Sequence, residues 1–461
     1  MIMKITVLNG SPKGQTSVTV QYVHFLQLKF PDVEFNILDV AQKIKKLDED
    51  KEAFQKVIEE ISAADAVLWA FPLYVLLVSS QYKRFIELIH ERESVFAFRG
   101  KPAAVLSTSI NYFDHTAHNY MNAICDDLQM KFMDSYSAEM NDLLKPRERQ
   151  RLKLFGEAFI RAVKEGAPAI RNNRPLIASA VAYEPRALKQ VETYGKKILI
   201  VADDIDRNTN LRFMVQNLQK TFLPSAELVQ LKDVDIQGGC LGCVQCGMDN
   251  ICIYQGKDGF IDFFEQKVKT ADILFIAGAI HDRYLSALWK CFFDRSFFNG
   301  HIPALEGKQI GFIISGPFGQ IHNLREILET YVGSQRSNLV GFVSDDLDDS
   351  EEINEALQIL ANRSVGYSKL GYFKPPTFLQ VGGIKLFRDA VWGRLRPVFQ
   401  ADHRYFKKHG YYNFPQKKYK WRLINSILVS LTKIPPFRRE FIKRIKKEMI
   451  KPFTHTLEKI K

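Results

Sequence analysis

The chain has 461 residues, which is too long for one ordinary hydrophobic core and predicts two or three domains. Its composition, 46% hydrophobic and 25% charged, is that of a folded globular protein and excludes a wholly disordered chain. The net charge of +12 is unevenly distributed: residues 367–461 hold 23 Lys and Arg against 5 Asp and Glu, whereas residues 1–366 hold 41 against 47. A basic tail on an acidic body predicts an anionic surface as the partner of the tail.

The first half of the chain alternates short apolar runs with amphipathic stretches. Its strands are expected at 5–8, 34–38, 66–71, 103–107 and around Phe132, and its helices at 17–30, 51–62, 81–92 and 118–128. The opening MIMKITVLNG lacks the features of a signal peptide and predicts the first strand. Five strands in this order indicate an α/β domain over 1–165, with a doubly wound, flavodoxin-like parallel sheet.

The loop after the first strand, NGSPKGQTS over 9–17, predicts a site for a terminal phosphate. A strand, a tight turn and a helix N-terminus bring backbone N–H groups and the positive end of the helix dipole together. The hydroxyls of Ser11, Thr16 and Ser17 and the ammonium of Lys13 add donors. The loop has neither the Walker nor the G-x-G-x-x-G pattern, and a capped helix after a Gly-Ser-Pro turn is the alternative interpretation.

A proline-containing stretch over 166–195 predicts a linker, after which the α/β unit repeats over 196–366. KITVLNG at Lys4 corresponds to KILIVAD at Lys197, an offset of 193, while ADAVLWA and ADILFIA differ by 207. The second unit has strands expected at 198–201, 226–231, 273–277, 309–315 and 338–342. The fourteen-residue difference in offset equals the length of 239–252, which predicts an insertion after the second strand of this unit.

The insertion carries four cysteines in GGCLGCVQCGMDNIC, spaced C-x2-C-x2-C-x5-C. Their thiolates suit one metal centre, and the compact run favours a [4Fe–4S] cluster, with zinc or disulfides as alternatives. The candidate ligands are Cys240, Cys243, Cys246 and Cys252. Cys125 and Cys291 are expected in the core. Thiols that bind a metal require a reducing compartment, so we expect a cytoplasmic protein.

The second unit replaces the phosphate loop with DDIDRNTN. Asp203, Asp204 and Asp206 stand where the first unit has Gly10, Ser11 and Lys13, and Arg207 does not offset three carboxylates. Because a phosphomonoester carries a charge of about −1.5 to −2 near pH 7, the acidic residues would repel it. The sequence therefore predicts phosphate binding in the first unit alone, and an Asp cluster that only faces solvent is the alternative interpretation.

Together these motifs resemble the iron–sulfur flavoprotein branch of the NAD(P)H-dependent FMN reductase family, within the flavodoxin-like superfamily. GSPKGQTS resembles the family's FMN-phosphate loop, FPLYVLLVSSQYKRFIELI resembles its flavin-facing segment, and CLGCVQCGMDNIC resembles its cluster motif. The resemblance covers residues 3–366 as two tandem units. It implies FMN and a [4Fe–4S] cluster as cofactors, and a redox partner such as NAD(P)H or a small electron carrier.

The resemblance also implies the residues of each site. The FMN phosphate would contact Ser11, Lys13, Thr16 and Ser17, and the flavin ring would contact Pro72, Leu73, Tyr74, Thr108 and Ser109. The family carries both motifs in one unit and brings flavin and cluster together by oligomerisation, whereas this chain has one motif in each unit. We therefore expect a fused pseudo-dimer with one FMN and one cluster per chain.

Three residues after the fourth strand, Asp114, His115 and His118, are candidates to line a substrate pocket. Capping of the next helix by Asp114 or Thr116 is the alternative. In the second unit Tyr284 and Trp289 are candidates to approach a flavin, although burial is the expected role of Trp289.

The basic, mainly helical C-terminal region over 367–461 has 17 aromatic residues in 95. From Phe437, apolar residues recur at Phe441, Ile442, Ile445 and Met449, with basic residues between them, which predicts an amphipathic helix. The expected roles are peripheral binding to the inner membrane surface or packing on the protein. Nucleic acid is not expected, because no recognition motif accompanies the charge.

The leading hypothesis from the sequence is therefore a flavin- and iron–sulfur-dependent oxidoreductase. The alternative is a non-enzymatic zinc- or flavin-binding regulatory module that docks through its basic tail.

Overall fold

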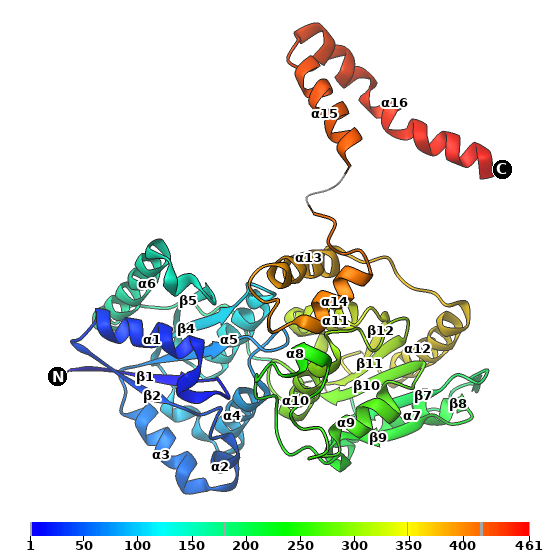
Figure 1. The fold of residues 1–461 in the computed structure, drawn as a ribbon. Helices are drawn as coiled ribbons and strands as arrows, with labels where there is room; N and C mark the ends of the chain where they lie inside the picture. The colour runs from blue at the N-terminus through cyan, green and yellow to red at the C-terminus, as the bar shows by residue number, and fades with distance from the viewer. Residues whose placement is uncertain (1, 179–180, 348, 415–417, 461) are drawn as a thin grey trace. The chain divides into compact units, whose positions relative to one another are not determined.

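The computed structural model describes residues 2–178, 181–347, 349–414 and 418–460. These form two compact units, Met1–Tyr405 and Phe406–Lys461. The first unit contains two sheets of five parallel strands each (Figure 1). The α/β fold class and the helical C-terminal region predicted from the sequence are confirmed.

The first sheet has the strand order β2-β1-β3-β4-β5. Its strands are β1 (Met3–Asn9), β2 (Val33–Leu38), β3 (Ala66–Pro72), β4 (Pro102–Ser109) and β5 (Lys131–Glu139). Its helices are α1 (Val18–Lys29), α2 (Ile44–Glu49), α3 (Lys51–Ser62), α4 (Ser80–Glu91), α5 (Asp114–Asp127) and α6 (Pro146–Glu165). Helices α1 and α6 cover one face, where Val23, Leu26 and Phe155 pack on Ile5 and Val7.

The second sheet has the equivalent order β9-β7-β10-β11-β12. Its strands are β7 (Ile198–Ala202), β9 (Glu227–Gln230), β10 (Ile273–Ala279), β11 (Gln309–Ser315) and β12 (Asn338–Ser344). Its helices are α7 (Thr209–Thr221), α8 (Cys246–Asp249), α9 (Phe260–Phe263), α10 (Ala287–Arg295), α11 (His322–Ser334) and α12 (Ser350–Leu370). A two-stranded pairing of β6 (Val191–Glu192) with β8 (Phe222–Leu223) was not foreseen.

The two sheets share one hydrophobic core, which is built around α4 and α5 from the first half and α10 and α11 from the second. Its members range from Trp69 and Tyr82 to Trp289 and Phe312. A continuous core shows that the two halves dock through their inner helices. Within the predicted linker 166–195, the described residues of 167–190 form neither helix nor strand, and β6 lies at 191–192.

The interface between the halves is nearly symmetric, because α4 and α10 carry matching residues. The Lys83–Glu87 pair in α4 corresponds, at the offset of 207, to the Lys290–Asp294 pair in α10. The Glu87 carboxylate accepts a hydrogen bond from the Ala287 backbone N–H at 2.7 Å, and Asp294 accepts one from Ser80 at 2.8 Å. Each acid therefore caps the N-terminus of the other helix, which favours negative charge there.

The remaining helices follow the second sheet. They are α13 (Phe378–Trp392), α14 (Gln400–Lys408), α15 (Tyr419–Leu431) and α16 (Pro435–Ile460). Helix α13 lies against α11, so residues beyond 366 still pack on the second half. The domain boundaries at 165, 196 and 366 stay a prediction. Among the described residues, no helix combines the length and apolar character needed to cross a membrane.

Candidate functional site

The β1–α1 loop is held tightly at the carboxyl edge of the first sheet. The backbone N–H of Gly10 donates to the carbonyl of Ala70 at 2.7 Å, which ties the loop to β3. A Cβ at Gly10 would lie only 2.6 Å from the Tyr82 ring, so this position requires glycine. At the carboxyl edge of such a sheet, ligands bind between strands where the order reverses, and β1 and β3 flank that point here.

The four candidate phosphate ligands lie together on this loop. Ser11 and Ser17 are buried, and their oxygens accept backbone hydrogen bonds from Lys13 at 3.2 Å and Thr19 at 3.2 Å, which leaves their own protons free to donate. Thr16 is exposed but donates its proton to the Lys13 carbonyl at 2.8 Å, so it must rotate before it can donate to a ligand. The donor set fits a phosphate at the N-terminus of α1.

The residues predicted at the flavin ring follow β3, which ends at Pro72. The backbone N–H of Leu73 donates to the Thr108 carbonyl at 3.1 Å. Tyr74 and Leu77 form two backbone hydrogen bonds with each other, at 2.8 and 2.9 Å. The Thr116 hydroxyl donates to the Leu76 carbonyl and fixes this tight turn from α5. The structure thus brings Pro72, Leu73 and Tyr74 to the same edge as the phosphate loop.

Thr108 and Ser109 end β4 at that edge, but both side chains are engaged. The Thr108 hydroxyl is buried and lies 2.6 Å from the hydroxyl of Thr19 in α1. Ser109 accepts a hydrogen bond from the backbone of Asn111 at 2.8 Å. In this structure Thr108 therefore anchors α1 to the sheet.

The cysteine loop of the second half lies directly against the phosphate loop of the first. A Cβ at Gly242 would fall 1.8 Å from the Tyr74 hydroxyl oxygen and 3.2 Å from Cε of Lys13. The Gln81 amide donates to the Cys240 carbonyl at 3.1 Å. Both halves of the chain therefore contribute to one place, through residues 159 or more positions apart.

All six cysteines are free thiols in the structure, so the structure does not support disulfides between the four cysteines of the loop. Burial raises the pKa of Cys240 to about 12, and burial together with the other three thiols of the loop raises the pKa of Cys246. The thiols of Cys240, Cys243 and Cys252 therefore lie near enough to Cys246 to interact with it electrostatically. In the described part of the chain, however, no three His, Cys, Asp or Glu side chains already converge in the geometry of a metal site.

Two further residues at this loop were not foreseen. His301 Nε2 lies 3.2 Å from the sulfur of Cys246, and His301 Nδ1 lies 2.8 Å from a carboxylate oxygen of Asp402. The three residues are separated by 55 and 101 positions, so no sequence motif marks them. Only the folding of α14 onto the second half brings them together.

The second unit's loop is closed by its own ion pairs. Lys232 bonds to Asp204 at 2.8 Å and also to Asp206, while Arg207 pairs with Asp204 at 3.1 Å. Burial raises the pKa of Asp203, whose side chain is almost fully enclosed. Carboxylates thus occupy the place that corresponds to the phosphate loop.

The other candidates have mostly structural partners. Trp289 is buried and donates to the Ala277 carbonyl at 3.0 Å, as expected, and Tyr284 is buried as well. His115 is exposed and pairs with Glu326 at 2.8 Å. His118 bonds to Ser107 at 2.6 Å, and burial lowers its pKa.

Three minor expectations can be judged directly. Cys125 and Cys291 are buried in the core, as predicted. Capping of α5 by Asp114 or Thr116 was wrong: Phe113 occupies the N-cap in a left-handed conformation and makes no side-chain cap.

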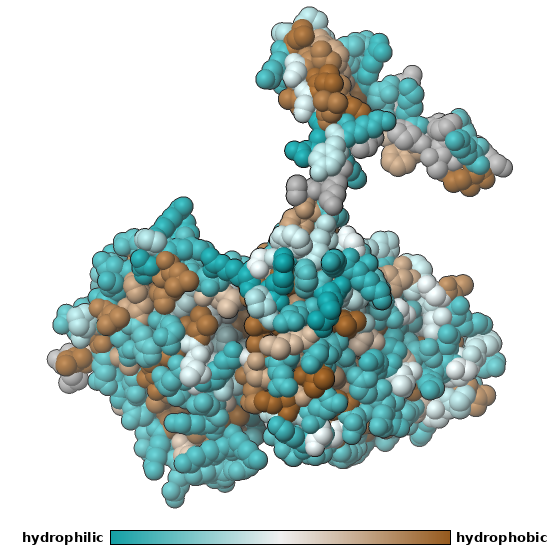
Figure 2. Space-filling view, in the orientation of Figure 1, coloured by the Kyte–Doolittle hydropathy of each residue, from teal (hydrophilic) through white to brown (hydrophobic). Residues whose placement is uncertain are grey.

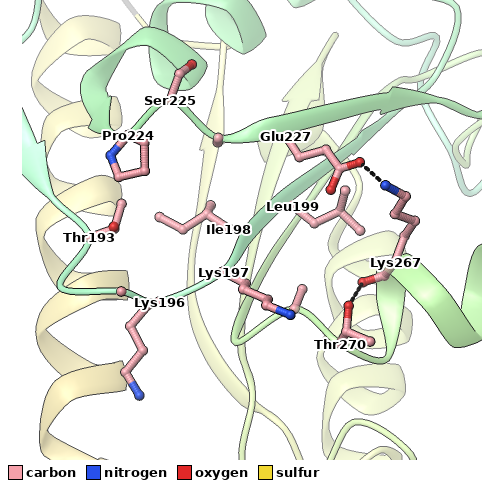
Figure 3. A pocket seen from close by; sticks show the side chains of 13 residues that line it. Thr193, Lys196, Lys197, Ile198, Leu199, Pro224, Ser225, Glu227, Lys267 and Thr270 are labelled. Atoms are coloured by element: carbon pink, nitrogen blue, oxygen red, sulfur yellow. Dashed lines mark hydrogen bonds and ion pairs between the residues drawn. The ribbon is translucent and has the colours of Figure 1, made fainter.

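A cavity of about 330 Å³ lies elsewhere, at the amino ends of β7 and β9 (Figure 3). Lys267 and Glu227 form an ion pair of 2.6 Å at its side, and Lys196 and Thr193 contribute to its wall. Ligands of doubly wound sheets bind at the opposite, carboxyl edge. This cavity is therefore not the candidate site.

The comparisons with known proteins bear on the first half. Residues 3–142 match the family model described as NADPH-dependent FMN reductase. The match runs from β1 to just past β5 and contains all nine residues predicted to bind FMN, but it spans less than a third of the chain. The first half is thus FMN reductase-like, which supports an oxidoreductase that uses FMN. Among curated proteins no match was found.

Several solved structures are similar to part of the chain. The flavoenzyme NAD(P)H:(acceptor) oxidoreductase FerB from Paracoccus denitrificans is 20% identical over 36% of this chain and 99% of its own, with a TM-score of 0.31. An NADH:FMN oxidoreductase in its apo form is 16% identical over 38% and 97%, with a TM-score of 0.30. General stress protein 14 from Treponema denticola, in complex with FMN, is 12% identical over 36% and 99%, with a TM-score of 0.27. The fold assignment itself rests on the strand order of the two sheets.

Proposed function

We propose that the protein is an NAD(P)H-dependent oxidoreductase that binds FMN in its first half and a [4Fe–4S] cluster on the cysteine loop of its second half. The observation that carries the proposal is the contact of Gly242 with Tyr74 and Lys13. It places the only clustered thiols of the chain beside the loop that matches an FMN reductase. A fused pseudo-dimer with one flavin and one cluster explains why each half keeps one motif.

The proposed ligands are those expected from the sequence. Ser11, Lys13, Thr16 and Ser17 would hold the FMN phosphate, and Pro72, Leu73, Tyr74, Thr108 and Ser109 would lie near the ring. Cys240, Cys243, Cys246 and Cys252 would ligate the cluster. When bound, FMN supplies two-electron exchange with NAD(P)H or a small carrier, and the cluster supplies single-electron transfer.

The protein's own residues would set position and charge. Lys13 is exposed and pairs with no carboxylate among the residues described, so its ammonium is available to an anion. Lys290 is buried and donates to the Tyr74 carbonyl at 2.9 Å, which fixes the turn beside the cysteine loop. Asp204 and Asp206 would keep a second FMN from the second half.

The second compact unit supports a further part of the proposal, which is peripheral binding to an anionic membrane surface. Residues 406–461 hold 16 Lys and Arg against 3 Asp and Glu. On α15 and α16 large apolar side chains face solvent, among them Leu423, Ile427, Ile442, Met449 and Phe453, each more than half exposed. Figure 2 shows apolar residues on the surface of these helices. Exposed apolar groups beside cations are typical of interfacial helices.

The test of the redox proposal is the cofactor content of the purified protein. Flavin bands with a shoulder near about 400 nm, one FMN per chain and about four iron atoms are expected. A protein that contains zinc and no iron would favour the regulatory module over the oxidoreductase. A flavin-free protein with no NAD(P)H oxidation would refute the proposal.

The test of membrane binding is co-sedimentation with vesicles that contain phosphatidylserine. The full chain should pellet, less so as salt is raised, because each basic residue near the surface contributes about 1 kcal/mol. Removing 418–461 should abolish pelleting while both cofactors remain. Replacing Ile442, Met449 and Phe453 by Gln keeps the charge and should weaken binding; a full chain that ignores the vesicles would contradict the idea.

A further inference from the structure

A buried chain of hydrogen-bonding groups leads from the C-terminal region to the cysteine loop. Cys246 is 8% exposed, and His301 and Asp402 are each 2% exposed. The aromatic rings of Phe297 and Phe399 enclose the imidazole, with centroids 4.6 and 5.5 Å from it. Polar groups so deeply buried are costly unless they are paired, and here every link is made within hydrogen-bond distance.

Three separate segments hold this arrangement. Cys246 begins α8, His301 follows the short helix Ser296–Asn299, and Asp402 lies in α14. Helix α14 and the segment before it also contact α8: a Cβ at Gly247 would fall 2.1 Å from the Val398 carbonyl oxygen, and Arg404 of α14 donates to the Met248 carbonyl at 2.5 Å. Residues outside both α/β repeats therefore complete the surroundings of one proposed ligand.

We infer that His301 is a positioning residue that donates an N–H···S hydrogen bond to Cys246 when this thiolate ligates the cluster, and that Asp402 orients the imidazole for it. The inference rests on the proposed cluster site. A thiolate has no proton and only accepts, so the hydrogen of the 3.2 Å contact must then come from His301 Nε2. Metal ligands are commonly oriented by such outer partners.

The expected consequence is electronic as well as geometric. A hydrogen bond to a ligand sulfur stabilises the more negative, reduced state of a cluster and raises its reduction potential. Of the four candidate cysteines, Cys246 is the most buried, while Cys243 is exposed. His301 therefore contacts the candidate ligand with the smallest exposed fraction of the four.

The experiment is a redox titration of the full-length holoprotein, followed by the EPR signal of the reduced cluster. His301→Ala removes the donor, and His301→Gln keeps an N–H that can reach the sulfur. Asp402→Ala leaves the imidazole without its orienting partner. His322→Ala, at an exposed histidine at the start of α11, is the matched control.

We expect His301→Ala to lower the equilibrium constant for one-electron reduction about tenfold, which is about 59 mV toward more negative potential. His301→Gln should recover part of this shift, Asp402→Ala should give an intermediate shift, and His322→Ala should give none. Iron content and flavin content should stay near those of the wild type in the glutamine variant.

The outcomes separate the two proposals. A wild-type protein without iron overturns the proposed function. If the wild-type protein contains the cluster and neither His301→Ala nor His301→Gln changes its potential, the role of His301 is overturned and the proposed function stays intact. If His301→Ala loses iron, the glutamine variant decides: a retained cluster whose potential lies less than about 59 mV below that of the wild type supports a donor role, and loss of iron in both variants refutes it.

Discussion

Gly242 offers a direct test of the contact between the two halves. Its φ is +62°, and a Cβ there would lie 1.8 Å from the Tyr74 hydroxyl oxygen. Ordinary contact begins near 3.4 Å, so Gly242→Ala forces the two groups apart by about 1.6 Å. Gly256 is the matched control, because its φ is +71° and nothing lies within 4 Å of its Cβ position.

Both substitutions carry the cost of a left-handed alanine, roughly 1–2 kcal/mol. Only Gly242→Ala adds the cost of overpacking, typically 1–3 kcal/mol. If that strain falls on Tyr74 at the flavin site, FMN should bind about 5- to 150-fold more weakly than in Gly256→Ala, since 1.4 kcal/mol is tenfold. Tyr74→Phe removes the clashing oxygen and leaves the next ring atom 2.9 Å away, so the double variant should regain part of the loss.

The assay is a flavin fluorescence titration of the four proteins that form this double-mutant cycle and of the control Gly256→Ala, with denaturant unfolding of each. A coupling between positions 242 and 74 is the expected result. If Gly242→Ala binds FMN as well as Gly256→Ala does, the cysteine loop does not touch the flavin site and the proposed pairing of cofactors falls.

Three further predictions concern single residues. Cys243→Ala should lose iron while FMN stays bound, and full iron content by elemental analysis would contradict the cysteine assignment. Lys13→Glu should release FMN in equilibrium dialysis because it places a carboxylate beside the phosphate, whereas Arg207→Glu should not; two FMN per wild-type chain would refute the asymmetry. Burial holds the pKa of His118 below its unfolded value of about 6.5, so the unfolded chain takes up the proton first and stability falls as pH drops below that value. In His118→Gln, the unfolding free energy measured by denaturant should therefore fall less between pH 7 and pH 5.

The strands were predictable because their signals are local, whereas phosphate binding by the first loop stays a prediction that rests on a local pattern. A strand such as β11 (Gln309–Ser315) is a continuous apolar run, and the sequence analysis placed it at the same residues. The loop that contains Ser11 and Lys13 can be recognised from the residue types of nine consecutive positions. Local patterns also predicted that the four closely spaced cysteines lie in an insertion after the second strand of the second half.

The contacts between distant segments were not predictable in this way. The hydrogen bond of His301 to Cys246 joins elements that only tertiary packing brings together, and single His and Asp residues have no distinguishing neighbours in sequence. Thr108 shows the same limit: its position at the end of β4 predicted a contact with the flavin ring, whereas its hydroxyl lies 2.6 Å from the hydroxyl of Thr19. A side chain's partner depends on packing that residue spacing does not encode.

The correspondence between the two halves connects the sequence pattern with the contacts between distant segments. At the offset of 207, Ser79, Lys83 and Glu87 correspond to Ser286, Lys290 and Asp294, and all of them lie at the interface of the halves or cap the helices there. These charged residues are buried, and the acid of each half accepts a hydrogen bond from the helix end of the other half. The loops after the first strand of each half differ instead: one has Lys13 at the proposed FMN phosphate site, and the other has Asp206 at the corresponding position. Matching residues at the interface and differing residues at the ligand edge are consistent with the proposal that the two halves share one flavin site.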